Sequence, residues 1–235
     1  GEIRRPATGP AKIIRIFRHN FRQSPSQTGA ALRNMNFAPG QHPRGQATQL
    51  AVTLQVVGLG GAGGNVVDKL AAIGLGASGF MAVDTDAQAL QRIVMARKVA
   101  VGAKRTRGLG CGGDPDLGRQ CIESAKRAMC KQLDEAEVVL MIAGMGGGLG
   151  TGAAPALARI ASAEGALVLG LALMPFECEG RRRMDQARVG LAQLRETADA
   201  VICLPNQYVL ELHGDDKSAQ ETFEAANALV LEGVL

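Results

Sequence analysis

The sequence of 235 residues contains no tryptophan, one tyrosine and six phenylalanines. With so few aromatic rings it lacks the stacking surfaces typical of single-stranded nucleic-acid binders, so nucleic acid is not an expected partner. No uninterrupted apolar run reaches about 18 residues, which predicts that no helix crosses a membrane. The five cysteines form no C-x-x-C pair, so we expect neither disulfides nor a metal site, and the chain fits a reducing cytoplasm.

Basic charge is concentrated in the first 50 residues. They carry eight Lys and Arg against Glu2 alone, whereas the remainder has 18 basic and 21 acidic residues. The net charge of +4 is therefore positive only because of the tail, since the remainder has more acidic than basic residues. We divide the chain into a basic tail, residues 1–50, expected to be disordered, and a globular domain, residues 51–235.

One segment of the tail, residues 12–22, has an amphipathic pattern. On a helical wheel its isoleucines and phenylalanines fill one half, and Lys12, Arg15, Arg18 and Arg22 fill the other. Such a basic amphipathic helix is typical of membrane-surface anchors, organelle transit elements and partner-binding helices. We expect it to bind anionic membranes, and the alternative is an arm that never docks.

Beyond the tail, short apolar runs alternate with longer mixed segments. The runs predict strands at Leu54–Leu59, Phe80–Asp84, Lys98–Val101, Val138–Ala143, Ala166–Leu173 and Ala200–Leu204. The mixed segments predict helices at Asn65–Ile73, Pro115–Leu133, Thr151–Ala163 and Arg183–Thr197. This alternation predicts an α/β fold with a doubly wound, Rossmann-like parallel sheet, whose ligands bind beyond the carboxyl ends of the strands.

A glycine-rich segment, residues 58–65, follows the first predicted strand. Gly58, Gly60 and Gly63 satisfy G-x-G-x-x-G, and Asp84 ends the second strand about 20 residues on, as in dinucleotide-binding domains. This pattern alone favours an NAD(P)-dependent oxidoreductase. The alternative is that the glycines serve only close packing of helix on strand.

Two further glycine-rich segments also precede helices. One spans residues 144–152 after the fourth strand, and the other spans 108–113 beside Lys104, Arg105 and Arg107. Several sets of backbone N–H groups at one edge favour a nucleoside triphosphate over a dinucleotide. The sequence has no G-x-x-x-x-G-K-[ST], so an ordinary P-loop is excluded.

At these residues the chain resembles the tubulin/FtsZ family, and within it the FtsZ cell-division GTPases. Gly146-Gly147-Gly148-Leu149-Gly150-Thr151-Gly152 is similar to the family's G-G-G-T-G-T-G signature, with Leu149 as its one departure. Similarity spans residues 52–235. Further ordered similarities lie at residues 82–90, 106–110, 175–184, 205–206 and 223–227.

The resemblance implies that the chain binds GTP or GDP. It implies phosphate or nucleotide contacts from Gly60, Gly61, Gly63, Gly64, Asn65, Asp84, Gly110, Gly146, Gly147, Gly148, Leu149, Gly150 and Thr151. It further implies that Glu179 and Arg183 contact the ribose, that Asn206 and Asn227 bind the guanine, and that Phe223 stacks on it. From the residues alone, a Phe at helical spacing such as Phe223 is more often a core residue, and an Asn after Pro such as Asn206 is more often a turn residue.

Three residues depart from the family pattern near the expected phosphates. Leu149 replaces a hydroxyl residue but keeps its backbone N–H, and it could instead pack against the following helix. Asp84 and Asp114 stand where the family has Asn, which adds negative charge. Bound Mg²⁺ would offset that charge.

The resemblance also implies head-to-tail filaments of the chain with itself or with complete FtsZ, in the cytoplasm at the division site on the inner membrane face. Family members complete GTP hydrolysis with an acidic loop that lies beyond the central helix, and the sequence stops at Leu235, inside that helix. We therefore expect a nucleotide-binding domain without the second domain, slow hydrolysis by this chain alone, and no catalytic residue within it. A chain of this kind could also cap filaments instead of extending them.

Overall fold

The computed structural model describes residues 52–74 and 77–207. The expected tail at residues 1–50, its amphipathic segment, and the predicted base-binding residues Phe223 and Asn227 lie outside the described residues. No described helix is both long enough and apolar enough to cross a membrane.

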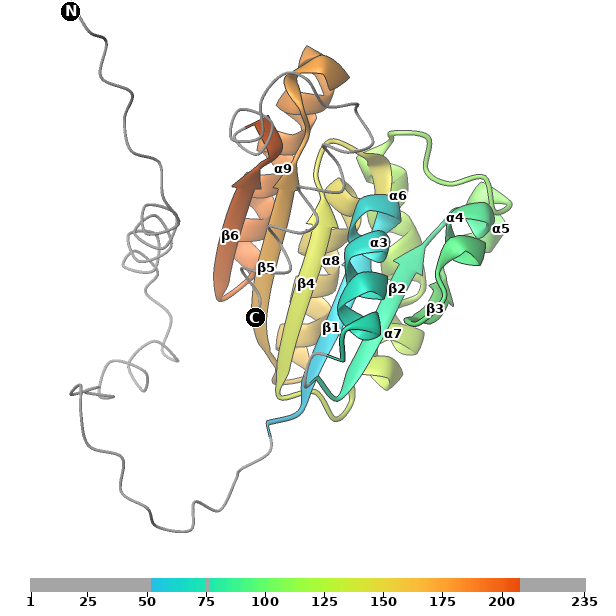
Figure 1. The fold of residues 1–235 in the computed structure, drawn as a ribbon, viewed down its shortest axis with the longest axis vertical. Helices are drawn as coiled ribbons and strands as arrows, with labels where there is room; N and C mark the ends of the chain where they lie inside the picture. Colours follow the sequence, from blue (N-terminus) through green and yellow to red (C-terminus); the bar gives the residue numbers. More distant parts are fainter. Residues whose placement is uncertain (1–51, 75–76, 208–235) are drawn as a thin grey trace, which may run out of the picture. The chain divides into compact units, whose positions relative to one another are not determined.

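Six parallel strands form one sheet in the order β3-β2-β1-β4-β5-β6 (Figure 1). They are β1 (Leu54–Leu59), β2 (Gly79–Asp84), β3 (Arg97–Ala100), β4 (Val138–Gly144), β5 (Leu167–Met174) and β6 (Ala200–Pro205). The predicted doubly wound parallel sheet is confirmed, and each strand begins and ends within one residue of its predicted bounds. The order of the strands reverses between β1 and β4, which both pair with their neighbours in parallel.

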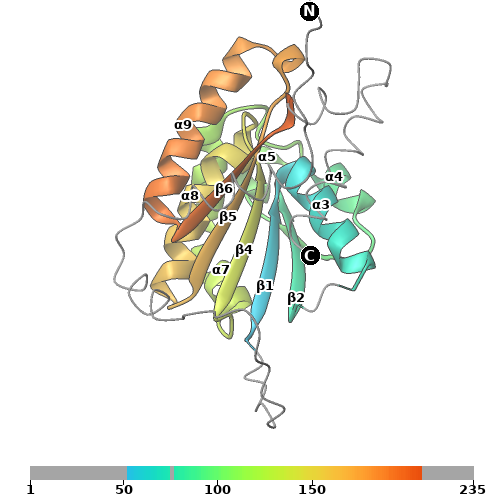
Figure 2. The same cartoon turned by 60° about the vertical axis from the view of Figure 1, so that its left-hand side comes forward.

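Helices cover both faces of the sheet (Figures 1 and 2). On one face lie α3 (Gly60–Ala72) and α4 (Ala87–Arg92). On the other face lie α6 (Pro115–Ser124), α7 (Lys126–Leu133), α8 (Gly148–Ala163) and α9 (Arg181–Thr197). The short helices α5 (Ala103–Thr106) and η1 (Glu177–Glu179) lie in the connections.

Side chains that alternate along the strands build the two halves of the core. Val57 and Met141 point to the cluster under α6 to α9, whereas Val56 and Ile142 point to the cluster under α3 and α4. All four are fully buried. Continuous apolar strands are therefore explained by burial on both faces, as expected for a parallel sheet.

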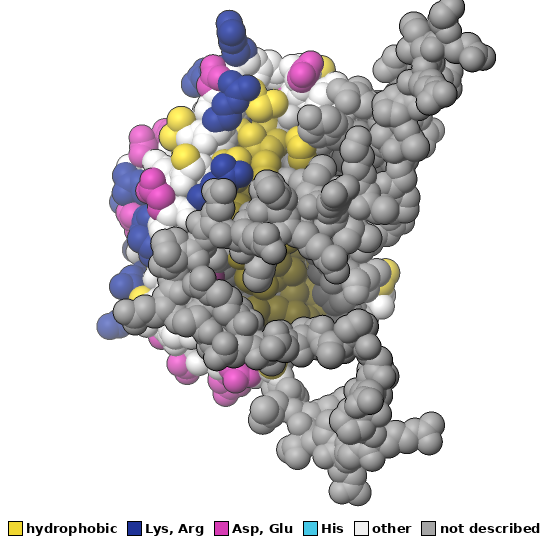
Figure 3. All heavy atoms as spheres, turned by 90° about the vertical axis from the view of Figure 1, so that its left-hand side faces the viewer, with side chains coloured by type: hydrophobic (Ala, Val, Ile, Leu, Met, Phe, Trp, Pro, Cys, Tyr) yellow, Lys and Arg dark blue, Asp and Glu magenta, His cyan; other side chains and the backbone are white. Residues whose placement is uncertain are grey.

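Hydrophobic side chains remain at the surface on the β6 side of the sheet. Seen from that side, they lie in the middle of the described surface and Lys, Arg, Asp and Glu line its border (Figure 3). Ile202 of β6 is 38% exposed, and Leu140 and Leu204 are only partly buried against the cluster under α3 and α4. The apolar cover of the sheet thus thins toward β6.

All four helix predictions differ from the structure, the last of them only in that α9 begins at Arg181 instead of Arg183. Helix α3 begins at Gly60 instead of Asn65, and α8 begins at Gly148 instead of Thr151, because their glycines form the first helical turn. The predicted helix over residues 115–133 is two helices, since the backbone leaves the helical region at Ala125 with φ −96° and ψ 6°. The corrected starts of α3 and α8 place the first two glycine-rich segments at helix N-termini.

Candidate functional site

An open cavity of about 570 Å³ lies beyond the carboxyl ends of β1, β2, β4 and β5. This volume is within the range of about 300–1,000 Å³ usual for small-molecule sites. It sits where the strand order reverses between β1 and β4, which is the position at which open parallel sheets bind ligands. The sheet therefore supplies the edge and the connecting segments supply the lining.

The glycines of the first segment have separate roles. A Cβ on Gly58 or Gly63 would collide with backbone atoms, of Gly63 and of Ile142 respectively, so both are needed for close packing of α3 on the sheet. Gly60 has φ +71°, a conformation that favours glycine. A Cβ on Gly61 would meet nothing within 4 Å, and Gly61 lines the cavity. The packing explanation thus holds for two of these glycines, and Gly61 leaves the first turn of α3 open to a ligand.

The glycines of the second segment, residues 144–152, also fall into those that pack against backbone and those that are open to the cavity. Gly148, Gly150 and Gly152 each lie against backbone of a neighbouring segment, which leaves no room for a side chain. Gly147 has φ −90° and ψ 174°, and a Cβ there would meet only the Arg183 guanidinium, at 3.9 Å. Gly147 is therefore the position at which the backbone at the start of α8 is most open to the cavity.

Thr151 lies outside the cavity lining and acts as a brace for this segment. Its Oγ1 accepts a hydrogen bond of 2.8 Å from the N–H of Gly146, and the residue is buried. Gly146 has φ +88°. In this structure Thr151 holds the glycine turn, and its phosphate contact stays a prediction.

Leu149 also lines the cavity, but it is only 5% exposed and belongs to the larger core cluster. Its side chain thus packs with the helices on that face of the sheet. This placement favours the packing explanation for the departure from the family signature.

The third segment is held against the β2–α4 connection. Gly108 accepts a hydrogen bond from the N–H of Ala87 at 2.9 Å, and Gly110 donates to the carbonyl of Thr85 at 3.2 Å. Gly110 has φ +78° and lines the cavity. The segment forms one wall of the cavity through these two backbone contacts.

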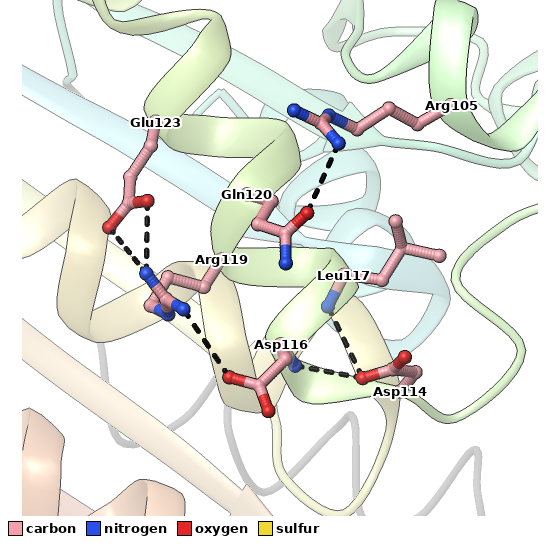
Figure 4. Close-up of polar contacts among 7 residues, drawn as sticks. All are labelled: Arg105, Asp114, Asp116, Leu117, Arg119, Gln120 and Glu123. Carbon is pink, nitrogen blue, oxygen red and sulfur yellow. Dashed lines mark hydrogen bonds and ion pairs between the residues drawn. The ribbon is translucent and has the colours of Figure 1, made fainter.

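Asp114 does not add its charge to the cavity lining. Its carboxylate caps α6 by accepting from the N–H groups of Asp116 and Leu117, at 2.9 and 3.2 Å (Figure 4). A carboxylate at a helix N-terminus is stabilised by the helix dipole and the unpaired N–H groups. The expectation that Asp114 adds charge beside a bound polyphosphate is therefore not supported by its place in the fold.

Asp84 ends β2 and lines the cavity while remaining only 8% exposed. Burial raises the pKa of its carboxyl above the usual value, and the charge of Asp86 adds to that effect. Hydrogen bonds from the N–H groups of Thr85, at 2.7 Å, and Asp86, at 3.1 Å, act in the opposite direction. The departure at this position places a titratable acid directly in the lining.

Glu179 and Arg183 lie on one side of the cavity and form an ion pair. The guanidinium and the carboxylate are 2.8 Å apart, and Glu179 also accepts a hydrogen bond from the N–H of Phe176. Both residues line the cavity, as does Asn206. The arrangement offers one anchored carboxylate and one half-exposed cation to a ligand.

The structure brings most of the predicted contact residues to one place. The cavity lining includes Gly60, Gly61, Asp84, Gly110, Gly147, Gly148, Leu149, Gly150, Glu179, Arg183 and Asn206. Gly64 and Asn65 line a small adjoining hollow of about 50 Å³ that shares Gly60, Gly61 and Asp84 with the cavity. The lining does not include Gly63, Gly146 or Thr151.

Sequence reasoning missed Gln186 of α9. Its side-chain amide donates to backbone carbonyls of both the second and the third glycine-rich segments. The available signal was its spacing, since Gln186 lies three residues after Arg183 and so shares a helix face with it.

Two glycine-rich helix N-termini and a cation facing one cavity are typical of nucleotide-binding α/β domains. The strand order is also that of dinucleotide-binding dehydrogenases. Topology therefore does not separate a domain that binds a nucleoside triphosphate from one that binds a dinucleotide. The separating feature is the second glycine-rich turn, at the start of α8.

Residues 53–214 match the model of the tubulin/FtsZ family GTPase domain. The chain belongs to the tubulin/FtsZ family. This assignment sets aside the oxidoreductase alternative and accounts for the second glycine-rich turn.

Solved structures agree with this assignment. An empty FtsZ dimer from M. jannaschii is 34% identical, with a TM-score of 0.74, over 78% of this chain and 53% of that one. CetZ2 from Haloferax volcanii, solved as a GTPγS-bound protofilament, is 29% identical with a TM-score of 0.71, over 78% of this chain and 57% of that one. CetZ1 from the same organism, a GDP-bound monomer, is 25% identical with a TM-score of 0.71, over 77% of this chain and 58% of that one. The chain thus spans about half the length of these relatives.

Proposed function

We propose that the cavity binds GTP or GDP. The observation that carries the proposal is the convergence of the first turns of α3 and α8 on a single cavity, with Gly61 and Gly147 both open toward it. Unpaired N–H groups and the positive ends of two helix dipoles would together face the phosphates. Arg183, whose guanidinium lies beside Gly147, adds a positive charge on the same side.

The remaining lining residues fit the other parts of a nucleotide. Glu179 has the acceptor oxygens that ribose hydroxyls need, and Asn206 offers both donors and acceptors to a base edge. Phe223 and Asn227, outside the described residues, complete the base contacts in this proposal.

Magnesium would bind here chiefly through the nucleotide. Among the described residues no group of three or more His, Cys, Asp or Glu could hold a metal ion. Mg²⁺ commonly takes one or two carboxylates together with substrate phosphates, and the carboxylate of Asp84 in the lining fits that role.

Nucleotide selectivity tests the proposal. A fluorescent GDP analogue bound to the full chain is displaced by unlabelled GTP, GDP, ATP or NAD⁺. We expect GTP and GDP to compete at concentrations about a hundredfold below ATP and NAD⁺, since a site that hydrogen-bonds one base rejects others strongly. Asn206→Ala should reduce the difference in affinity between guanine nucleotides and ATP, whereas Gln193→Ala, at an exposed position of α9, should not. Equal competition by NAD⁺ would instead support a dinucleotide site.

We further propose that the chain takes part in head-to-tail filaments of the cell-division or cytoskeletal type. A relative solved as a protofilament supports this, as does Leu109, which is 81% exposed and lies at the cavity. A large apolar side chain beside a ligand site is suited to contact with a neighbouring subunit. The proposal extends to GTP hydrolysis completed at contacts between subunits of the complete protein.

Sedimentation with and without GTP tests the filament proposal. Leu109→Ser, which adds no charge at the cavity, should prevent assembly, while Val189→Ser, at a 60% exposed position on α9, should leave assembly intact. Monomeric sedimentation of the chain at every concentration, alone and mixed with a complete family member, would contradict it.

A further inference from the structure

Gln186 of α9 ties together two segments that line the cavity. Its Nε2 donates to the carbonyl of Gly113 at 3.0 Å, of Gly146 at 3.3 Å and of Gly147 at 3.4 Å. Two amide hydrogens serve three acceptors, so at least one hydrogen is shared. The third and second glycine-rich segments are about 30 residues apart in sequence, and one half-buried side chain holds their backbones together.

These contacts also set the direction of the peptide units at the start of α8. In a trans peptide the C=O and the following N–H point in opposite directions, and the described residues contain no cis peptide. Because the carbonyls of Gly146 and Gly147 point to Gln186, the N–H groups of Gly147 and Gly148 point away from it. Both residues line the cavity. They stand at the first positions of α8, where a helix has no internal acceptors for its N–H groups.

We propose that Gln186 is a positioning residue for nucleotide binding: by holding three carbonyls behind the glycine turn, it fixes the N–H groups of Gly147 and Gly148 toward the phosphates. The inference rests on the proposed nucleotide site. Gln186 itself does not line the cavity and acts through the backbone. An acceptor in place of its Nε2 would face three carbonyl oxygens and push them away.

Two variants and a matched control test this role in the full chain. Gln186→Met keeps the length of the side chain and its helix propensity but removes the donor, and Gln186→Glu places acceptor oxygens against the carbonyls. Gln193→Met makes the same change at an exposed position of the same helix. The readouts are affinity for a fluorescent GDP analogue, amide hydrogen exchange of residues 144–150 without nucleotide, and the apparent thermal midpoint.

We expect Gln186→Met to bind the analogue about tenfold more weakly than Gln193→Met, and Gln186→Glu to bind it more weakly still. Exchange at residues 144–150 should quicken in both Gln186 variants, while Gln186→Met keeps the thermal midpoint of the control. Equal affinity and equal exchange in Gln186→Met and Gln193→Met would overturn the inference. If the unmodified chain fails to bind the analogue, the proposed nucleotide site is wrong. The positioning role is then judged from hydrogen exchange alone: equal exchange of residues 144–150 in Gln186→Met and Gln193→Met would overturn it.

Discussion

The glycines around the cavity differ in what surrounds each one. Gly148, Gly150 and Gly152 lie against backbone of other segments, whereas Gly61 and Gly147 have open space where a side chain would begin. A signature rich in glycine therefore combines positions that let segments pack with positions that let a ligand approach. Sequence alone gives both kinds the same letter.

A comparison of Gly147→Ala with Gly148→Ala separates these roles. The backbone at Gly147 suits any residue, so we expect its variant to keep its free energy of unfolding within about 1 kcal/mol. Its methyl group should nonetheless obstruct phosphate and lower GDP affinity about tenfold or more. A Cβ at Gly148 would lie 2.6 Å from Cys111 and 2.8 Å from the Asp114 carbonyl oxygen, so that variant should lose about 1–3 kcal/mol of stability. Chemical denaturation and GDP titration of both variants measure the difference, and equal destabilisation would contradict the division.

Asp84 makes both stability and binding depend on pH. Burial raises the pKa of this acid in the folded chain, so folding favours its protonated form. Its contribution to stability is fully present below the pKa of an unperturbed aspartate, 3.8, and is lost as pH rises through the folded pKa. Ionised Asp84 should also repel phosphate by about 1 kcal/mol.

Asp84→Asn should therefore remove this pH dependence. We expect the variant to gain GDP affinity over the unmodified chain above the folded pKa and to match it more closely in acid. Titrations with GDP at several pH values, without Mg²⁺, measure the effect. Glu135→Gln, at an exposed position, controls for net charge. A constant ratio of affinities across pH would count against the account.

At the scale of elements, the first turns of α3 and α8 are built from glycine although glycine is a weak helix former. Tertiary packing overrides the propensity, because Gly63 lies under the backbone of β4 and Gly150 under Gly144. The first contact joins segments distant in sequence and the second closes a turn within residues 144–150, and neither is contained in helix propensity, which placed both helix starts too late. The break at Ala125 likewise lacks a Gly or Pro signal.

Asp68 joins α3 to the segment before β3. Its carboxylate accepts from the N–H groups of Val94, Met95 and Ala96, with Oδ1 at 3.0, 2.6 and 2.9 Å. Burial alone would raise the pKa of Asp68, but these hydrogen bonds and Lys98 lower it below the usual value. The charged form is therefore favoured by folding.

Asp68→Ala should cost about 1–3 kcal/mol of unfolding free energy at neutral pH, because three N–H groups lose their acceptor. The stabilisation is present above pH 3.8 and lost as pH falls through the folded pKa, so the variant and the unmodified chain should converge in acid. Denaturation curves at neutral and acid pH measure this, with Glu135→Ala as the control. A loss that stays the same in acid would show that the charge of Asp68 is not its source.

At the scale of the whole molecule, the alternation of apolar and mixed segments predicted the parallel sheet and the edge where ligands bind. The strands follow from local pattern because a strand covered on both faces is apolar, as β5 is throughout and β1 is except at Gln55. The braces of the site could not be predicted, because Gln186 and Thr151 act through contacts that only the folded chain creates. The helix cap at Asp114 was missed although it is local, because its carboxylate accepts from N–H groups two and three residues on and Pro115 follows it.

The crystal structure of the full chain grown with GDP tests the central claim most directly. We predict electron density for the diphosphate between the first turns of α3 and α8, within hydrogen-bond distance of the N–H groups of Gly61, Gly147 and Gly148. The ribose should lie toward Glu179 and the base toward Asn206. A GDP molecule bound elsewhere, or an empty cavity at saturating GDP, would contradict the account.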